Sequence, residues 1–245
     1  MVRSQGRTSF LYTYRSRIRK NGMSRVTEFS AVNLIASAGV DPEKWNLTPS
    51  NEIVEETVKA IKERGIRVIQ AGNVNEALEV LITLIPSGAE VMNGSSTTLM
   101  EIGYPEYVQS GRSGWKDLHD VVTAENDDRK RAELRRKSVA AEYFVSGANA
   151  IARTGEIVAC DKTGSRVGAW PFAAGKLILV VGTNKIVPTL DSALRRVREY
   201  SFPLENARAQ RAYGTPSRIG KCVILEYEQN EGRVILILVN EKLGY

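Results

Sequence analysis

Apolar residues in the first half of the chain alternate between helical and strand spacing. After Ser50, a good N-cap residue, they lie three or four positions apart, which predicts a helix. Residues 66–69 form a strand-sized apolar run. A second helix begins after Asn73 and stops at Pro86, and residues 90–92 predict the next strand. Helix, strand, helix, strand is the order of a parallel sheet flanked by helices.

The second half is richer in strands. Residues 123–137 predict one helix, with acids in its first turns and basic residues after them, which complements the helix dipole. The turn at 161–164 predicts a hairpin between the strand before it and residues 166–169. Short apolar runs separated by glycines predict strands at 143–145, 150–152, 157–160 and 177–181.

The C-terminal part is expected to complete the sheet. A helix begins near Thr189, with Arg195, Arg196 and Arg198 on its outer face, and ends at Pro203. Residues 223–227 and 234–239, joined by a turn, are expected to close the sheet, with the second of them buried and central. Upstream, the proline-bracketed segment 41–49 predicts a loop.

Charge is concentrated at the N-terminus. The chain has 34 Lys and Arg against 28 Asp and Glu, a net charge of +6. Residues 1–22 hold six basic residues and no acid, so residues 23–245 are neutral overall, with 28 residues of each sign. A neutral body argues against a nucleic-acid-binding domain, and no nucleic-acid partner is expected.

Residues 1–22 allow several interpretations. Their acid-free, Arg- and Ser-containing composition resembles a mitochondrial transit peptide. They are also typical of a dispensable tail, with Met23 rather than Met1 as the start, or of an anion-binding arm. Residues 23–245 then form a single α/β domain with its core at about 50–245. No apolar run approaches the roughly 18 residues of a membrane helix. We therefore expect no membrane partner and a cytoplasmic location, or a mitochondrial one if residues 1–22 are a transit peptide.

Cysteine and histidine are scarce. Two cysteines, Cys160 and Cys222, cannot supply a disulfide framework or the four thiolates of an iron–sulfur cluster. The single His119 excludes sites that need two histidines and is interpreted as a surface or capping residue. We expect no metal and no cofactor.

The first candidate site is a polar turn between the strand at 90–92 and a short helical segment. A glycine permits a tight turn, and hydroxyls with free N–H groups suit an anion at the carboxyl end of a strand. An ordinary Ser/Thr N-cap is the alternative. The residues are Gly94, Ser95, Ser96, Thr97 and Thr98.

The second candidate site lies after the strand predicted at 143–145. Asn149 offers hydrogen bonds to a ligand, Thr154 and Gly155 form a turn, and Glu156 could act as a general base. A tight hairpin with a solvent-facing Glu156 is the alternative.

The third candidate site follows the strand at 177–181. There Asn184 and Lys185 are placed to meet a carboxylate or phosphate, although a surface lysine in a loop would have the same sequence. Arg135, Arg136 and Arg166 could add local positive charge.

Five segments together resemble the LUD domain of lactate-utilisation proteins. They are 94–103, 149–158, 161–169, 181–187 and 239–245. The resemblance implies a Rossmann-like three-layer α/β sandwich of the NagB/RpiA/CoA-transferase type. It also implies that Gly94 to Thr98 form an anion loop faced by Lys185, and that the protein takes part in lactate oxidation to pyruvate alongside iron–sulfur partner proteins.

Two functions stay open. The chain is an accessory ligand-binding subunit of an oxidoreductase complex for lactate or a related organic acid. Alternatively, it is a stand-alone NagB/RpiA-like enzyme of isomerase or transferase type, acting on a small phosphorylated or acyl substrate with Glu156 or Glu101 as base. A small anionic metabolite is the expected ligand in both cases, and the sequence leaves homo-oligomerisation open.

Overall fold

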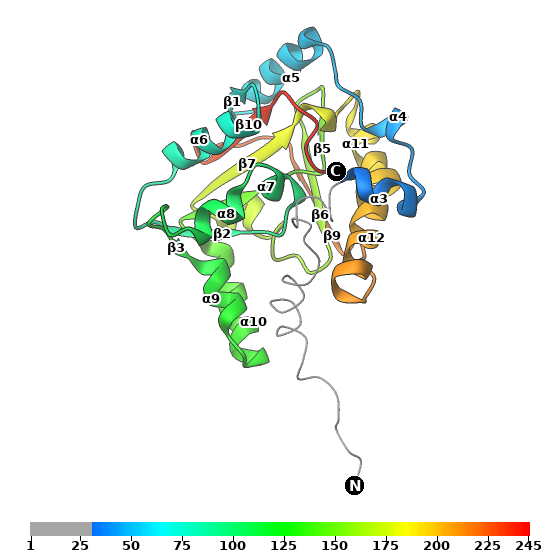
Figure 1. Cartoon of the computed structure of the whole chain (residues 1–245). Coiled ribbons are helices and arrows are strands. Elements are labelled where there is room, and N and C mark those ends of the chain that lie inside the picture. Colours follow the sequence, from blue (N-terminus) through cyan, green and yellow to red (C-terminus); the bar gives the residue numbers. More distant parts are fainter. Residues whose placement is uncertain (1–30) are drawn as a thin grey trace.

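The structure, a computed structural model, describes residues 31–245 (Figure 1). The basic segment 1–22 and Met23 lie outside the described residues. The described chain forms two sheets that share an apolar interior, and helices lie on the outer side of each. This confirms the α/β class, while the second sheet adds a layer that the sequence did not indicate.

The larger sheet has six strands, and each neighbouring pair is parallel. The predicted strands at 66–69, 90–92, 143–145, 177–181 and 234–239 are confirmed in it. The last of them is buried at every position between two neighbours, as expected. The order across the sheet is β1 (Arg67–Ala71), β10 (Val234–Val239), β7 (Lys176–Gly182), β4 (Tyr143–Ser146), β2 (Glu90–Asn93) and β3 (Lys116–Asp117).

The smaller sheet has four strands, in the order β8 (Ile186–Val187), β5 (Ala150–Ala152), β6 (Ile157–Asp161) and β9 (Lys221–Leu225). The prediction that 223–227 and 234–239 close one sheet together is wrong. β9 pairs with β6, whereas β10 lies in the larger sheet. The burial patterns explain the separation, because β10 is covered on both faces while β9 leaves most of its residues partly or fully exposed.

The predicted hairpin partner at 166–169 is also wrong. After β6, both carboxylate oxygens of Asp161 accept backbone N–H groups of the following loop, including those of Arg166 at 3.0 Å and Val167 at 3.1 Å. These side-chain bonds replace the strand ladder. The chain then enters the π-helical segment η3 (Ala169–Ala173).

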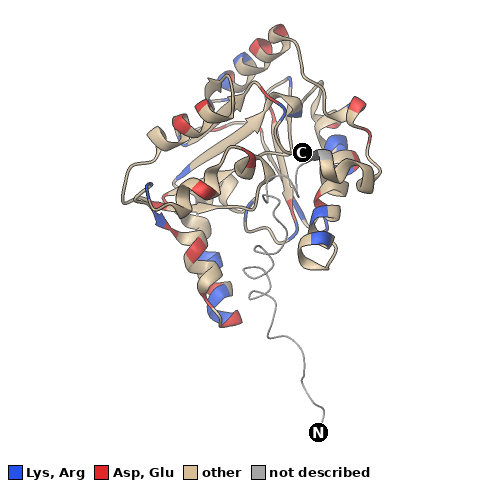
Figure 2. Cartoon of the chain, viewed as in Figure 1, with Lys and Arg blue, Asp and Glu red and all other residues tan. Residues whose placement is uncertain are grey.

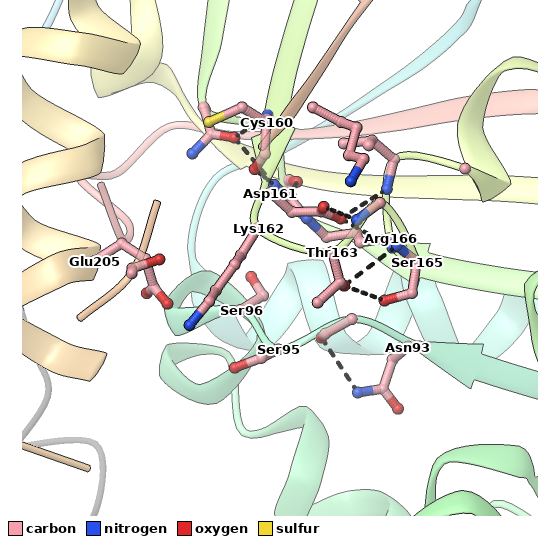
Figure 3. A pocket seen from close by; sticks show the side chains of 18 of the residues that line it. Asn93, Ser95, Ser96, Cys160, Asp161, Lys162, Thr163, Ser165, Arg166 and Glu205 are labelled. Atoms are coloured by element: carbon pink, nitrogen blue, oxygen red, sulfur yellow. Dashed lines mark hydrogen bonds between the residues drawn. The ribbon is translucent and has the colours of Figure 1, made fainter. Parts of the chain in front are cut away.

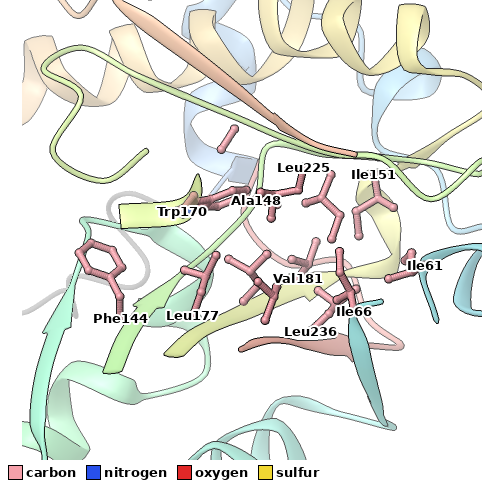
Figure 4. Close-up of a cluster of buried hydrophobic side chains, with 14 of the residues drawn as sticks. Ile61, Ile66, Phe144, Ala148, Ile151, Trp170, Leu177, Val181, Leu225 and Leu236 are labelled. Atoms are coloured by element: carbon pink, nitrogen blue, oxygen red, sulfur yellow. The ribbon is translucent and has the colours of Figure 1, made fainter. Parts of the chain in front are cut away.

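The larger sheet is covered on both faces. On one face lie α6 (Val74–Leu84), α7 (Thr97–Glu101) and α8 (Tyr104–Gln109). On the other lie α5 (Asn51–Glu63) and the smaller sheet. Figure 4 shows the resulting interior, where Leu177, Val181 and Leu236 of the larger sheet face Ile151 and Leu225 of the smaller one. Burying each such side chain contributes about 1.5–3 kcal/mol.

Helices also cover the outer side of the smaller sheet. They are α3 (Ala31–Ala38), α11 (Leu190–Arg196), the π-helical η5 (Val197–Ser201) and α12 (Phe202–Tyr213). The prediction that Pro203 ends a helix is wrong. Pro203 lies in the first turn of α12, directly after the π-helical η5, and the helical run continues through it from Leu190 to Tyr213.

Two other predictions about helices are wrong, and in both cases aspartate N-caps explain where the helices begin. The single helix expected at 123–137 is divided into α9 (Leu118–Ala124) and α10 (Asp128–Lys137), because Asp117 and Asp127 each cap a separate start. The expected loop at 41–49 contains α4 (Pro42–Trp45), which Asp41 caps. Short 3₁₀ segments, η2 (Ser138–Ala140) and η4 (Thr183–Lys185), follow α10 and β7. Within residues 31–245, no helix is long and apolar enough to cross a membrane.

Candidate functional site

A cavity of about 1450 Å³ lies beyond the carboxyl ends of β2 and β4 (Figure 3). Its walls include the turn after β2, the loop that follows Asp161 in β6, and residues of α10 and α12. Parallel strands place their carboxyl ends at one edge of a sheet, which is where such sheets bind ligands. The cavity therefore occupies the position that the sequence indicated for a ligand.

The polar turn lines this cavity along its whole length, from Gly94 to Thr98. Ser96 is the N-cap of α7, and its Oγ accepts the N–H of Leu99 at 3.3 Å. Ser96 is therefore an N-cap, as the alternative interpretation had it, and the turn still lines the cavity. A Cβ at Gly94 would lie 2.7 Å from Cδ of Arg166, so only glycine permits this approach.

Lys185 is the most enclosed cation of the cavity wall. It ends η4, just after β7, and its side chain is only 2% exposed. Its Nζ donates hydrogen bonds to Oγ1 of Thr98 and to the carbonyl of Ala148, both at 3.0 Å. Burial lowers the pKa of Lys185 to about 7, and the positive charge of Arg196 acts in the same direction.

Arg166 is held by three acceptors. Its guanidinium donates to the carbonyl of Gly147 at 2.6 Å, to Oδ1 of Asn149 at 3.1 Å and to the carbonyl of Cys160 at 2.5 Å. Oδ1 of Asn149 also accepts the N–H of Cys160 at 3.0 Å. Asn149 thus lines the cavity and positions Arg166 there.

A third cation lies behind Asn149. Arg196 is fully buried and donates to the carbonyl of Trp45 and to Oγ of Ser201, while its Nη2 has no hydrogen-bond partner among residues 31–245. The expectation that Arg196 faces outward is wrong. Ala193, Val197 and Tyr200 are buried on the same side of the helical segment, and this spacing could have placed Arg196 there.

These cations lack ionic partners. None of the salt bridges found within the described part of the chain involves Lys185, Arg166 or Arg196. Burying a cation without a counter-ion is costly, and the cost rises when like charges are close. The inner end of the cavity is therefore electrostatically suited to an anion.

Asp161 acts electrostatically on Arg166 and lines the cavity, whereas Glu101 acts on Lys185 and does not line it. Oε2 of Glu101 accepts the N–H of Gly244 at 2.6 Å. Burial raises the pKa of Glu101, although Lys185 counteracts part of this effect. Gly244 also packs against Lys185, where a Cβ would lie 3.3 Å from Nζ, so the segment containing Gly244 lies directly beside the Lys185 amine.

The outer part of the cavity is strongly basic. Figure 2 shows Lys and Arg along α10 and α12, both of which contribute lining residues. Glu205 is already neutralised, since both its oxygens accept from Arg208 at 2.7 Å. Nine basic residues line the cavity against three acids, although residues 23–245 are neutral overall. The basic residues are Arg131, Arg135, Arg136, Lys162, Arg166, Lys185, Arg208, Arg218 and Lys221.

Five of the candidate residues lie outside the cavity, namely Glu101, Thr154, Gly155, Glu156 and Asn184. Glu156 pairs with Arg64 at 2.5 Å and accepts a hydrogen bond from Thr154. Gly155 has a φ of 98° and packs closely against α5. The side chain of Asn184 accepts the N–H of Leu243, which secures the C-terminal segment. The structure thus brings together the turn, Asn149, Arg166 and Lys185, with Arg135 and Arg136 also lining the cavity.

The C-terminal segment was missed as part of the site. Tyr245 lines the cavity and donates its hydroxyl to Glu205 at 2.8 Å. The sequence indicated a turn at 161–164, but not that the carboxylate of Asp161 would hold the loop that follows. Among residues 31–245, no group of three or more His, Cys, Asp or Glu side chains has the arrangement of a metal site.

Comparisons with known proteins place these features in a family. A model of the LUD domain matches residues 54–239, a range that includes the polar turn, Arg166 and Lys185. A DUF162 family protein from Deinococcus radiodurans aligns at 15% identity over 78% of this chain and 99% of its own, with a TM-score of 0.46. Translation initiation factor eIF-2B from Pyrococcus horikoshii OT3 aligns at 16% identity over 74% and 81%, with a TM-score of 0.30. No curated protein matches the sequence.

Proposed function

Since this chain belongs to the LUD domain family, we propose that it binds a small organic acid anion at the inner end of its cavity. In this role it is a ligand-binding subunit for the utilisation of lactate or a related acid. The observation that carries the proposal is the pair Lys185 and Arg166 in the cavity wall, with Arg196 buried behind Asn149. None of the three forms a salt bridge within the described residues.

The chemistry of a 2-hydroxy or 2-oxo acid fits this end of the cavity. The carboxylate of the acid would pair with Lys185 and accept hydrogen bonds from the polar turn. The hydroxyl or keto oxygen on carbon 2 would hydrogen-bond to the hydroxyl of Ser96 or Thr98. Charge-assisted hydrogen bonds of this kind are about twice as strong as neutral ones. Binding would also supply the negative charge that the buried cations lack.

Electron transfer in this proposal belongs to iron–sulfur partner proteins. The two cysteines of the chain are too few to hold a cluster. The basic outer part of the cavity, with Arg131, Arg135 and Arg136 on α10, supports docking of an acidic surface of such a partner.

Titration calorimetry with lactate and pyruvate tests the ligand. We expect binding to wild type, loss of binding to Lys185→Met, and unchanged binding to Lys176→Met. Lys176 is the matched control because it lies exposed at the amino end of β7, the strand whose other end leads to Lys185. Absence of heat with either acid, together with no iron–sulfur protein in co-purification, would remove this function.

A stand-alone NagB/RpiA-like enzyme is the second candidate. It is favoured by Lys185, whose pKa of about 7 makes the amine available for proton transfer beside Thr98. The cavity of about 1450 Å³ also exceeds the roughly 300–1,000 Å³ of most small-ligand pockets, which leaves room for a phosphorylated or acyl-carrier substrate. Incubation with phosphosugars and CoA thioesters, followed by NMR for turnover, distinguishes the two: conversion supports the enzyme, and binding without conversion supports the subunit.

A further inference from the structure

The two cysteines of the chain, 62 positions apart in sequence, lie opposite one another in the smaller sheet. β6 and β9 are antiparallel, and their register pairs Cys160 with Cys222. Cys222 is exposed and Cys160 is partly exposed, and both line the cavity. The two thiols are close enough for Cys222 to contribute to the raised pKa of Cys160.

The backbone around Cys160 shows which kind of pair this is. Within a strand, the N–H and C=O of one residue point to the same side. At Cys160 both point away from β9, because the N–H donates to Asn149 and the C=O accepts from Arg166 (Figure 3). Cys160 and Cys222 therefore form a non-hydrogen-bonded pair, in which the Cα atoms lie about 4.5 Å apart. Disulfides span Cα separations of about 4.4–6.8 Å, so a bond can form here.

We propose that Cys160 and Cys222 form a reversible disulfide in the wall of the cavity, with a hydroperoxide as oxidant. The Cys222 thiolate attacks one peroxide oxygen, which breaks the O–O bond and yields a sulfenic acid; the hydroxide or alkoxide that leaves takes a proton from solvent. The Cys160 sulfur then attacks the sulfenic sulfur, the S–S bond forms, and the hydroxide that leaves takes the Cys160 proton as water. A dithiol reverses the reaction by exchange.

The order of attack follows from the surroundings of each thiol. Burial raises the pKa of Cys160 to about 12, which suppresses its thiolate. Cys222 is exposed, so an oxidant from solution reaches its sulfur first. Cys222 is therefore the reacting residue and Cys160 the resolving one.

Formation of this disulfide would change the position of Arg166 at the anion site. This consequence rests on the proposed function. The backbone of Cys160 holds both Asn149 and the guanidinium of Arg166. Closing the S–S bond changes the spacing of β6 and β9 at Cys160, which disturbs these bonds and loosens Arg166, so the oxidised protein should bind the organic acid several-fold more weakly.

Mild hydrogen peroxide treatment of the folded full-length protein tests the disulfide. We expect loss of both titratable thiols, a mass decrease of two hydrogens, a cross-linked peptide pair containing Cys160 and Cys222, and a rate independent of protein concentration. Dithiothreitol should restore both thiols. Disulfide-linked dimers, sulfinic acid at Cys222 without a cross-link, or two persistent thiols would each overturn the proposal.

The single variants supply the controls. Cys160→Ser should leave a sulfenic acid on Cys222 that dimedone traps, and Cys222→Ser should leave Cys160 unreacted. Calorimetry with pyruvate on the reduced and oxidised protein then tests the consequence for binding, with peroxide-treated Cys222→Ser as the matched control. Equal affinity in both redox states would refute the coupling, whereas a lack of binding in both states would count against the proposed function instead.

Discussion

Lys185 and Thr98 are joined by a hydrogen bond of 3.0 Å between Nζ and Oγ1, across 87 positions of sequence. The bond ties the segment that follows β7 to the helix that follows β2. Two of the motifs on which the family resemblance rests thereby share one wall of the cavity. The buried amine is held in place before any ligand arrives, which is the preorganisation that a tight anion site needs.

Replacement of Lys185 by methionine should remove most of the anion affinity. A hydrogen bond to a charged group contributes about 1.5–3 kcal/mol, so binding should weaken by about 10- to 100-fold. Titration calorimetry measures this, with Lys176→Met as the control that keeps the charge change but leaves the cavity intact. An equal loss in both variants would show that overall charge, rather than Lys185, decides binding.

Anion affinity should fall as the pH rises through 7. Because burial holds the pKa of Lys185 at about 7, its charge is present below that pH and lost above it. A bound anion raises this pKa, so binding takes up a proton near neutrality and is tightest in the acidic range. Calorimetry in buffers of different ionisation enthalpy detects the proton. Affinity that is flat from about pH 6 to about pH 9 would contradict the assignment of Lys185 as the titrating group.

Gly94→Ala should disturb the site through Arg166. The new Cβ would lie 2.7 Å from Cδ and 2.9 Å from Cγ of a side chain whose guanidinium is fixed by three acceptors. Overpacking of this kind destabilises by about 1–3 kcal/mol. Denaturant unfolding measures the effect, and in an Arg166→Ala background the same glycine substitution should be nearly neutral. Additive losses in the double variant would mean that Gly94 matters for another reason.

Glu156→Gln should affect stability and leave ligand binding unchanged. Glu156 lies outside the cavity, paired with Arg64 and bonded to Thr154. Loss of its charge weakens a largely buried ion pair, for which we expect a decrease of about 1–3 kcal/mol in the free energy of unfolding. A normal melting temperature combined with lost binding or activity would restore Glu156 as a candidate general base.

Much of the fold is visible in the sequence because the larger sheet is apolar on both faces. Its strands are short apolar runs bounded by glycine, proline and caps, and β10 is the clearest example. The smaller sheet was harder to predict. β9 is too exposed to show a core pattern, and the ladder expected after β6 is replaced by side-chain bonds from Asp161, which depend on the local loop.

The candidate site also contains residues that the sequence indicates and residues that it does not. Gly94 to Thr98 and Lys185 follow directly from their places after buried strands, since carboxyl ends of parallel strands meet at one edge. Glu156 has an equally suitable side chain, but its direction is set by Arg64 from a distant helix. Arg196 is charged and lies in an arginine-rich helix, so its burial depends on tertiary packing that residue type alone does not reveal.

A crystal structure of the protein grown with pyruvate or lactate would show directly whether the acid binds beside Lys185. We expect difference density for the carboxylate between Nζ of Lys185 and the turn formed by Gly94 to Thr98, with Arg166 within reach, and no such density in Lys185→Met. Density for the acid at another place, or at the same place and occupancy in Lys185→Met, would rule out Lys185 as the anion-binding residue.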